Sequence, residues 1–271
     1  MDTLAFTDDL GRVCVVPARP QRIISLCPSI TETLVALGAP VVGRTRFCIH
    51  PAPEVRSITR VGGTKEIHFD RIEALHPDLI ICEKEENTPE MVSRLSAAYP
   101  VVVFDVRSVD GAIGMIAVLG RLTALPEAAS LAARIRETWT ALIPRHPAPR
   151  TAYLIWREPW MGAGQDTYIG DVLRRSGYTN VLETLPGRYP VVTPDQLRAL
   201  APELVLLSSE PFPFGAAHME EVQAWLPDAD IRLVDGEVFS WYGVRMLEAA
   251  ACLTALASGK TAPLMDDEGE L

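Results

Sequence analysis

One amphipathic stretch near the middle of the chain, residues 125–142, limits the possible folds more than any other segment. Pro126 suits a first helical turn, and Pro144 and Pro147 end the pattern. The apolar positions between them recur at helical spacing: Ala128, Leu131, Ala132, Ile135, Trp139 and Leu142. At about 1.5 Å per residue such a helix spans roughly 25 Å, the width of a small domain. We therefore expect residues 125–142 to form one long helix, the main part of a linking segment at residues 125–146 that joins two bodies.

The sequence patterns on the two sides of this helix resemble each other. Residues 70–81 match residues 195–206 in residue type at most positions, and residues 30–38 match residues 169–177. In both halves short apolar strands alternate with helices, which is typical of a parallel sheet covered on both faces. The chain is therefore predicted to be α/β, with two Rossmann-like lobes at residues 1–124 and 147–260. The acidic residues 261–271 are expected to form a tail.

Shorter patterns add detail to the first lobe. Residues 6–16 are predicted to form a hairpin with its turn near residues 9–11. The strand at residues 22–26 leads into a helix over residues 30–37. Ser29 is the expected cap of that helix, and Glu32 would complete a capping box.

The composition excludes several classes of function. The chain of 271 residues carries a formal net charge of −10, which argues against sequence-independent binding of nucleic acid. No run approaches the ~18 apolar residues of a membrane-spanning helix. Residues 1–20 lack the pattern of a secretory signal, so the sequence as written predicts a cytoplasmic protein. Five cysteines without a CxxC pair favour free thiols in a reducing compartment.

Loops at the carboxyl ends of the strands would hold the site, because ligands of open α/β sheets bind there. Aromatic residues gather in or beside these loops, above all in the second half: Phe47, Trp156, Trp160, Tyr168, Tyr189, Phe212, Phe214, Phe239, Trp241 and Tyr242. Such residues suit a large, flat, partly apolar ligand. Basic residues occur in the same loops: Arg46, Lys65, Lys84, Arg157, Arg188 and Arg245. They indicate an anionic or amide-bearing ligand.

Metal binding by the protein alone is not expected. His50 and His68 fall on loops of the first lobe, and Cys48 lies near His50, but the corresponding loops of the second lobe contain no histidine. A closed protein site would need roughly four matched ligands. The chain also lacks GxSxG, HExxH and paired Cys–His signatures, so no catalytic residue is predicted and an enzyme is only a third interpretation.

Three stretches carry a family resemblance: residues 22–38, residues 61–63 and residues 70–80. They resemble the substrate-binding proteins of cobalamin and iron-siderophore ABC importers, and the hairpin segment around residues 7–12 is similar as well. The resemblance covers about residues 5–257. It implies the class III periplasmic binding protein fold, with two α/β lobes joined by one rigid helix. It further implies capture of a metal chelate between the lobes, with no intrinsic cofactor, by a monomer that does not insert into membranes.

The resemblance also implies a set of ligand-binding positions. The cobalamin-binding branch contacts its ligand through the loops that hold Ser29, Phe47, Thr64, Glu83, Trp156, Tyr189 and Trp241 in this chain. Thr64 and Glu83 stand where that branch has tryptophans. Arg157, Trp160 and Tyr242 join the candidate set because of their charge or aromatic character in the same loops. A cobalamin-like corrinoid is the first expectation for the ligand, with a ferric siderophore or haem as alternatives.

Two carboxylates match positions at which the family docks onto arginines of the transporter. These are Asp70 and Asp195, each at the start of a helix, where capping of the helix is the alternative role. A binding protein that serves an ABC importer permease is the first interpretation of the chain. Its family is usually periplasmic or lipid-anchored outside the cell. A cytosolic corrinoid or haem carrier or sensor without a transporter is the second.

Overall fold

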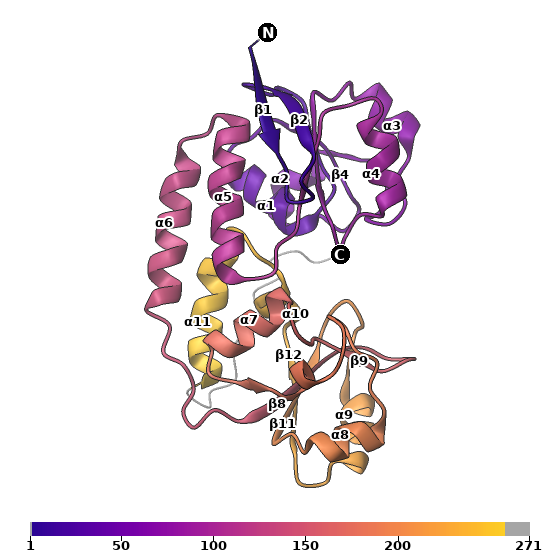
Figure 1. Cartoon of the computed structure of the whole chain (residues 1–271), viewed down its shortest axis with the longest axis vertical. Coiled ribbons are helices and arrows are strands. Elements are labelled where there is room, and N and C mark those ends of the chain that lie inside the picture. The colour runs from indigo at the N-terminus through magenta and orange to yellow at the C-terminus, as the bar shows by residue number, and fades with distance from the viewer. Residues whose placement is uncertain (1, 258–271) are drawn as a thin grey trace.

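The computed structural model describes residues 2–257, so the acidic segment at residues 261–271 lies outside the described residues. Two lobes stand one above the other and are connected along one side by helices (Figure 1). The chain opens with an antiparallel hairpin, in which β1 (Thr3–Thr7) pairs with β2 (Val13–Pro17), as the sequence predicts. No described helix is both long and apolar enough to cross a membrane.

A five-stranded parallel sheet forms the centre of the first lobe, in the order β5-β4-β3-β6-β7. The strands are β3 (Ile23–Ser25), β4 (Val41–Arg44), β5 (Thr59–Arg60), β6 (Leu79–Glu83) and β7 (Val101–Phe104). The helices are α1 (Pro28–Ala36), α2 (Ala52–Arg56), α3 (Phe69–Ala74), α4 (Pro89–Ser96) and α5 (Val109–Thr123). Successive residues of β6 pack into different core clusters, Leu79 and Ile81 in one and Ile80 and Cys82 in the other, so helices cover both faces.

The second lobe repeats this arrangement. Its sheet runs β10-β8-β11-β12 in parallel, and β9 is added antiparallel to β8. The strands are β8 (Arg150–Trp156), β9 (Met161–Gly162), β10 (Thr179–Asn180), β11 (Leu204–Ser208) and β12 (Asp230–Val234). The helices are α7 (Tyr168–Arg175), the short 3-10 helix η1 (Val181–Thr184), α8 (Pro194–Leu200), α9 (Ala216–Trp225), α10 (Gly236–Ser240) and α11 (Met246–Ala257). In both lobes the first strand lies inside the sheet: β3 between β4 and β6, and β8 between β10 and β11, with β7 and β12 outermost on one side. The first lobe carries β5 as an additional strand beyond β4. Two separate sheets of matching strand order confirm the α/β prediction.

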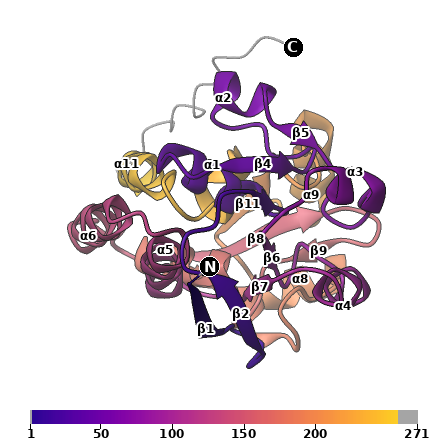
Figure 2. The same cartoon turned by 90° about the horizontal axis from the view of Figure 1, so that it is seen from above.

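The connection between the lobes is broader than one helix. The helix expected over residues 125–142 is α6 (Glu127–Thr140), which is two residues shorter at each end. Ala124 adopts a left-handed conformation with φ 56° and reverses the chain, so α5 runs back beside α6. Helix α11 packs on α6 as well, and the three helices lie together at one side of the molecule in both views (Figures 1 and 2).

Helices α5, α6 and α11 together form a helical wall, and one hydrophobic core cluster extends along this helical wall through both lobes. It joins Ile30 and Leu34 of α1, in the first lobe, to Met246 and Leu253 of α11, in the second. Trp139 of α6 also donates a hydrogen bond from its indole N–H to the Met246 carbonyl, at 2.9 Å. The lobes are therefore held by continuous packing rather than by a flexible linker.

The start of α1 differs from the prediction. Its N-cap is Cys27, which makes no side-chain capping bond, and Pro28 occupies the first turn. Ser29 is inside the helix, and Glu32 turns away from the cap to pair with Arg245 of the other lobe, at 2.9 Å. The expected capping box is therefore wrong, because a buried cation in the second lobe provides a stronger partner for Glu32 than a backbone N–H.

Candidate ligand-binding site

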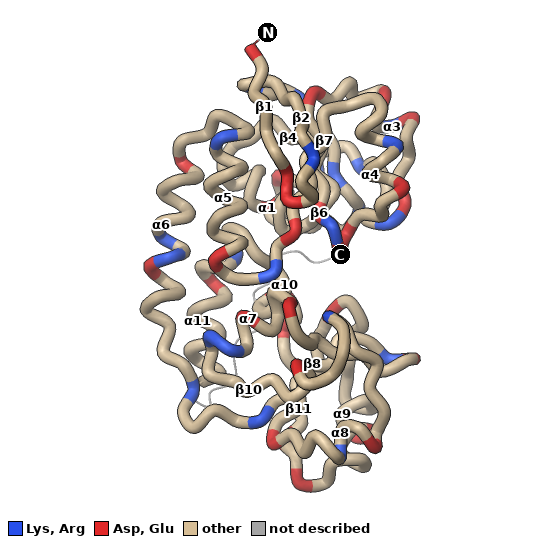
Figure 3. The backbone as a smooth tube through the Cα atoms, in the orientation of Figure 1, with Lys and Arg blue, Asp and Glu red and all other residues tan. Residues whose placement is uncertain are grey.

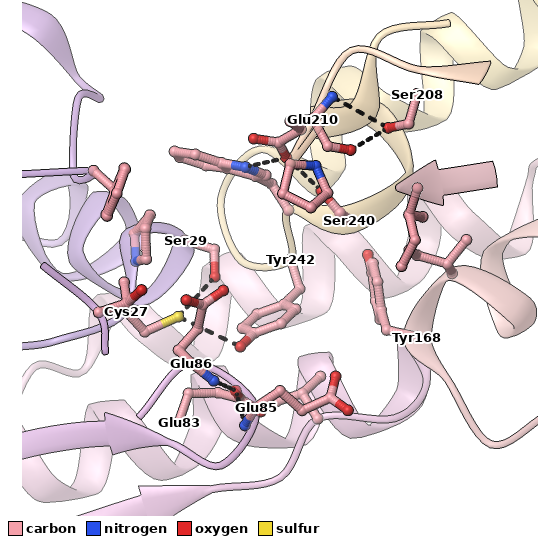
Figure 4. Close-up of a pocket in the computed structure, with 18 of the residues that line it drawn as sticks. Cys27, Ser29, Glu83, Glu85, Glu86, Tyr168, Ser208, Glu210, Ser240 and Tyr242 are labelled. Atoms are coloured by element: carbon pink, nitrogen blue, oxygen red, sulfur yellow. Dashed lines mark hydrogen bonds between the residues drawn. The ribbon is translucent and has the colours of Figure 1, made fainter. Parts of the chain in front are cut away.

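A cavity of about 560 Å³ lies between the lobes and is lined by residues of both. Figure 4 shows Cys27, Ser29 and three glutamates facing residues of the second lobe across it. The lining belongs to the loops that follow the strands, which is where an open α/β sheet presents its ligand site. The volume falls within the range of roughly 300–1,000 Å³ that is typical of small-molecule and cofactor pockets.

Seven of the ten expected ligand-binding residues line this cavity: Ser29, Phe47, Thr64, Glu83, Tyr189, Trp241 and Tyr242. The structure places the other three, Trp156, Arg157 and Trp160, outside it. Side chains alternate along a strand, and at the end of β8 it is Ile155 that lines the cavity. Trp156 packs edge-on against Phe212 instead.

Trp160 and Arg157 are held elsewhere in the second lobe. Trp160 stacks on Phe214 at 5.5 Å between ring centroids and meets Trp225 edge-on at 5.0 Å. Arg157 pairs with Glu221 at 3.0 Å and with Glu158 at 2.7 Å. Both residues therefore stabilise the second lobe rather than form the cavity wall.

The basic residues of the predicted loops contribute little positive charge to the cavity. Lys84 pairs with Asp105, Arg188 with Glu85, and Arg245 with Glu32 and Glu237. Among the described residues that line the cavity, Arg46 is the only Lys or Arg. It is exposed and lies over the ring of exposed Phe47, 4.7 Å from the centroid. Of the two ligand classes that the sequence indicated, anionic or amide-bearing, the basic residues of the lining therefore offer little to the anionic one.

Carboxylates dominate the cavity instead. Glu83 ends β6, Glu85 and Glu86 follow in the next loop, and Glu210 lies in the loop after β11, on the opposite side of the cavity (Figure 4). Burial raises the pKa of Glu83 to about 7 and that of Glu210 to about 7. Burial also raises the pKa of Glu86, against the lowering effect of nearby Lys65.

The loop after β6 is fixed by its own hydrogen bonds. One oxygen of Glu83 accepts from the backbone N–H groups of Glu85, at 2.7 Å, and Glu86, at 3.0 Å. Buried Asn87 donates to the carbonyls of Leu26 and Thr64 and accepts from the N–H of Glu83. The acidic side chains are thus presented by a rigid loop.

Two tyrosines of the second lobe reach the base of the cavity. The Tyr242 hydroxyl and the Cys27 thiol share a hydrogen bond across the lobes at 3.5 Å, and burial raises the pKa of both groups. Tyr168 is only 5 % exposed, yet within residues 2–257 its hydroxyl has no hydrogen-bond partner. Figure 4 shows its ring directed into the cavity beside Tyr242.

Polar contacts bridge the lobes beside the cavity. Tyr189 donates to Glu85 at 2.5 Å, and Arg188 pairs with the other oxygen of that carboxylate at 2.6 Å. A second group joins Arg245 to Glu32 of the first lobe and to Glu237 of the second, at 2.9 and 3.1 Å. His50 completes this group by contacting Glu237 at 3.2 Å.

The sequence had named the loops around several residues that it failed to select individually. Cys27, Glu86 and Glu210 each belong to a loop expected at the carboxyl end of a strand, and all three line the cavity. Tyr168 was noted only as one aromatic among many. Its burial without a partner is a property of the folded structure that no sequence pattern signals.

Asp70 and Asp195 lie on the surface, in the first turns of α3 and α8. Neither caps its helix: the cap of α8 is Thr193, whose hydroxyl accepts from the N–H of Gln196, and the cap of α3 is His68, without a side-chain bond. Asp195 pairs with Arg198 in the next turn. The two helices lie on the same side of the molecule, away from the helical wall (Figure 1).

Two further features bear on what the site can do. Over residues 2–257 no group of three or more His, Cys, Asp or Glu side chains is arranged to hold a metal ion. Figure 3 shows acidic and basic residues interspersed along the described backbone of both lobes.

The fold and the position of the cavity agree with a comparison against known families. The model of a periplasmic binding protein family matches residues 23–228, most of the chain. The chain belongs to this family. The resemblance found in the sequence is thereby confirmed.

Individual relatives share the length of the chain. A vitamin B12-binding protein of Pectobacterium carotovorum is 26 % identical over 262 residues, covering 90 % of this chain and 92 % of the relative. The crystal structure of the vitamin B12-binding protein of Vibrio cholerae superposes with a TM-score of 0.75 at 22 % identity, covering 89 % of this chain and 98 % of that one. A periplasmic haem-binding protein of Roseiflexus gives 0.77 at 21 % identity, with 88 % and 98 % covered. These relatives are binding proteins, and the structural likeness establishes the two-lobed fold.

Proposed function

We propose that this protein is a non-enzymatic receptor that binds a corrinoid in the interlobe cavity and delivers it to an ABC importer. The observation that carries the proposal is the composition of the cavity wall. Aromatic Phe47, Tyr189 and Trp241 supply flat apolar surface, and buried Glu83 and half-buried Glu210 supply hydrogen-bond acceptors. A corrin ring offers a matching chemistry, because it is broad and apolar in the plane and carries amide N–H donors around its edge.

The alternatives fit this wall less well. The propionates of haem and the charged oxygens of a ferric catecholate siderophore are anions, and they would meet Glu83, Glu86 and Glu210 with one exposed cation, Arg46, in the lining. The vitamin B12-binding relative, whose alignment covers 90 % of this chain, also supports a corrinoid as the ligand.

Titration with cyanocobalamin tests the proposal directly. Trp241 lines the cavity whereas Trp156 does not, so a bound corrinoid should quench the fluorescence of the first more strongly. We expect saturable quenching with a Kd well below roughly 100 μM, weaker quenching in Trp241→Phe and unchanged quenching in Trp156→Phe. The absence of binding by cyanocobalamin up to that concentration, with haem or a ferric hydroxamate binding in its place, would refute the choice of a corrinoid.

Delivery to a transporter requires a docking surface, for which we propose exposed Asp70 and Asp195. Exposed charges contribute little to folding, typically under ~1 kcal/mol each, whereas a desolvated contact in a complex is worth ~2–5 kcal/mol. The double variant Asp70→Ala with Asp195→Ala should keep its melting temperature and ligand affinity but lose capture of the cognate permease. Glu137→Ala, at an exposed position on α6, is the control. Unaltered capture by the double variant would exclude this docking surface.

A cytosolic carrier or sensor without a transporter is the second candidate, and the cysteines favour it. All five are free, and Cys27, Cys48, Cys82 and Cys252 are buried. Free thiols are typical of a reducing compartment. Cell fractionation of the native organism distinguishes the two: recovery with the membrane or outside the cytoplasm supports import, and recovery only in the cytosol supports the carrier.

A further inference from the structure

The cavity contains carboxylates that form no ion pair with any described Lys or Arg. Glu85 is paired with Arg188, but Glu83, Glu86 and Glu210 form no ion pair with any described residue. Glu83 is 3 % exposed and accepts only backbone N–H groups, and Glu210 accepts from the Ser240 hydroxyl at 2.7 Å and the Trp241 indole at 2.8 Å. Carboxylates left without cations inside a protein are costly, and natural structures rarely keep them without a use.

The groups that face Glu83 and Glu210 add no positive charge, and Lys65 is the one cation near Glu86 among the described residues. Glu83 is faced by acidic or neutral groups of both lobes: Cys27, Cys82, Glu85, Glu86, Tyr189 and Tyr242. Glu210 is faced by Asp235, Glu237 and Tyr153 in addition to its hydrogen-bond donors. Lys65 stabilises the charge of Glu86 but donates to the backbone carbonyl of Glu85. Arg46 is exposed, and its guanidinium group lies over the ring of Phe47.

A second observation in the same cavity also indicates a ligand. The Tyr168 hydroxyl is buried at 5 % exposure and lacks a partner in the described part of the chain, although its ring lines the cavity. An unsatisfied buried hydroxyl destabilises a protein, and a hydrogen bond with a bound molecule would remove that cost. The carboxylates and the hydroxyl belong to different elements and face one space, so a single ligand can satisfy both.

We propose that Glu83, Glu86 and Glu210 make the site selective for metal chelates of positive or zero net charge with peripheral hydrogen-bond donors, and exclude chelates that carry free carboxylates. The inference rests on the proposed receptor function and specifies the charge class of its ligand. Each carboxylate accepts from an amide or ammonium group of the ligand, Tyr168 satisfies a further polar group, and Trp241 and Phe47 cover the apolar plane. An added carboxylate on the ligand would face Glu83 or Glu210 instead.

A positive ligand should also release protons when it binds. The pKa values of Glu83 and Glu210 are both about 7 in the free protein, so each carboxyl is partly protonated at neutral pH. A bound cation favours the ionised form and lowers both pKa values. Its affinity should therefore rise with pH between about 5.5 and 7.5, and level off above that range, where both groups are already ionised.

Two matched pairs of chelates test the charge rule, and each pair differs by one charge. Cyanocobalamin is neutral, and its monocarboxylic derivative, in which one peripheral amide is hydrolysed, is negative. Ferrioxamine B carries a free ammonium group, and its N-acetyl derivative is neutral. By calorimetry at pH 8, we expect the more positive member of each pair to bind on the order of 30-fold more tightly, because one charge interacts with two carboxylates across a partly desolvated cavity.

Variants assign the preference to particular residues. The double variant Glu83→Gln with Glu210→Gln retains hydrogen-bond acceptors but removes two charges, and should reduce the preference within each pair to about 3-fold or less. It should also remove the rise of ferrioxamine B affinity with pH. Glu137→Gln, which removes one charge from the exposed face of α6, should keep both properties. Tyr168→Phe should weaken all bound chelates alike, because it removes a hydrogen bond and not a charge.

The outcomes separate this inference from the receptor function on which it rests. Equal binding of both members of a pair by the native protein, or a preference that persists in the double variant, overturns the charge rule while leaving a chelate receptor. Binding of the ferrioxamines with the expected preference but no binding of corrinoids supports the charge rule and refutes the corrinoid. Failure of all four probes to bind overturns both.

Discussion

Glu85 and Glu210 occupy the same position in the two lobes, each two residues beyond the end of the corresponding strand, β6 or β11, which pairs with the first strand of its sheet. Both line the cavity, but their partners differ. Glu85 of the first lobe pairs with Arg188 and Tyr189 of the second. Glu210 accepts only neutral donors of its own lobe, Ser240 and Trp241.

The difference shows how two similar halves divide one task. A carboxylate that pairs across the cavity holds the lobes together, whereas one that accepts only neutral hydrogen bonds keeps its charge available for a ligand. Glu32 pairs with Arg245 of the other lobe and is therefore, like Glu85, a carboxylate that holds the lobes together. Glu83 accepts only neutral hydrogen bonds and is therefore, like Glu210, available for a ligand. A repeated fold therefore supplies equivalent positions, and the sequence of the neighbouring loops decides their use.

The largest expected effect concerns the carboxylates that hold the lobes together. Arg245 is 7 % exposed, and its removal in Arg245→Ala leaves Glu32 and Glu237 without their cation. Breaking such a buried pair costs about 3–5 kcal/mol in the free energy of unfolding. Urea denaturation measures this loss. The double variant Glu32→Leu with Arg245→Met should lose much less, because it removes both charges. Equal losses in the two proteins would show that packing and not charge pairing is at stake.

A smaller effect of opposite sign is expected for Glu210. Its pKa of about 7 is raised by burial above its ordinary value of 4.5, so the fold favours the protonated carboxyl. That contribution is complete below about pH 4.5 and is lost as pH rises through 7. Glu210→Gln should therefore match the native protein near pH 4.5 and exceed its stability by about 2 kcal/mol at pH 8.

Glu85→Gln is the matched comparison for Glu210→Gln. It removes the charge at the equivalent position, but there Arg188 loses its partner. Because that pair is partly exposed, the loss should be under about 1 kcal/mol, and the variant should be less stable than the native protein at pH 8. Thermal unfolding at pH 8 compares the two variants. A change of the same sign in both would contradict the division between pairing and ligand-facing carboxylates.

The smallest expected effect is a movement of the lobes. The shared core cluster along α5, α6 and α11, together with the contacts of Glu32 and Glu85, opposes a hinge rotation. Solution X-ray scattering with and without saturating ligand should give nearly superimposable curves. A clear decrease in the radius of gyration on binding would mean that the polar contacts between the lobes open and close during function.

The sequence predicts the fold better than the site. Apolar periodicity and the repeat of residues 70–81 at 195–206 are local signals, and both lobes follow them. The ends of α6 were misplaced by two residues each, since Leu125 and Leu142 continue the apolar pattern beyond the hydrogen-bonded helix. The start of α1 was misjudged because Glu32 finds its partner more than two hundred residues away.

The site depends on similarly distant contacts. The sequence indicates which segments hold Glu83 and Trp241, but it does not fix which side chain of a segment faces the cavity. At the end of β8 the sequence selected Trp156, whereas its neighbour Ile155 lines the cavity. The sequence indicated an anionic or an amide-bearing ligand and could not choose between them, because it shows that Arg188 and Arg245 exist but not that Glu85 and Glu32 neutralise them. Pairing across the lobes is a property of the three-dimensional structure alone.

The core cluster shared by the lobes also has a consequence for synthesis of the protein. Helix α11 is the last element that the structure describes, yet Met246, Ala249 and Leu253 pack in the same cluster as Ile30 of α1 and Ile135 of α6. A growing chain emerges from the ribosome with its N-terminal end first. The first lobe therefore has its sheet long before it has the apolar surface that closes its core. We expect the nascent protein to expose that surface until α11 has been synthesised, and to depend on chaperones during that interval.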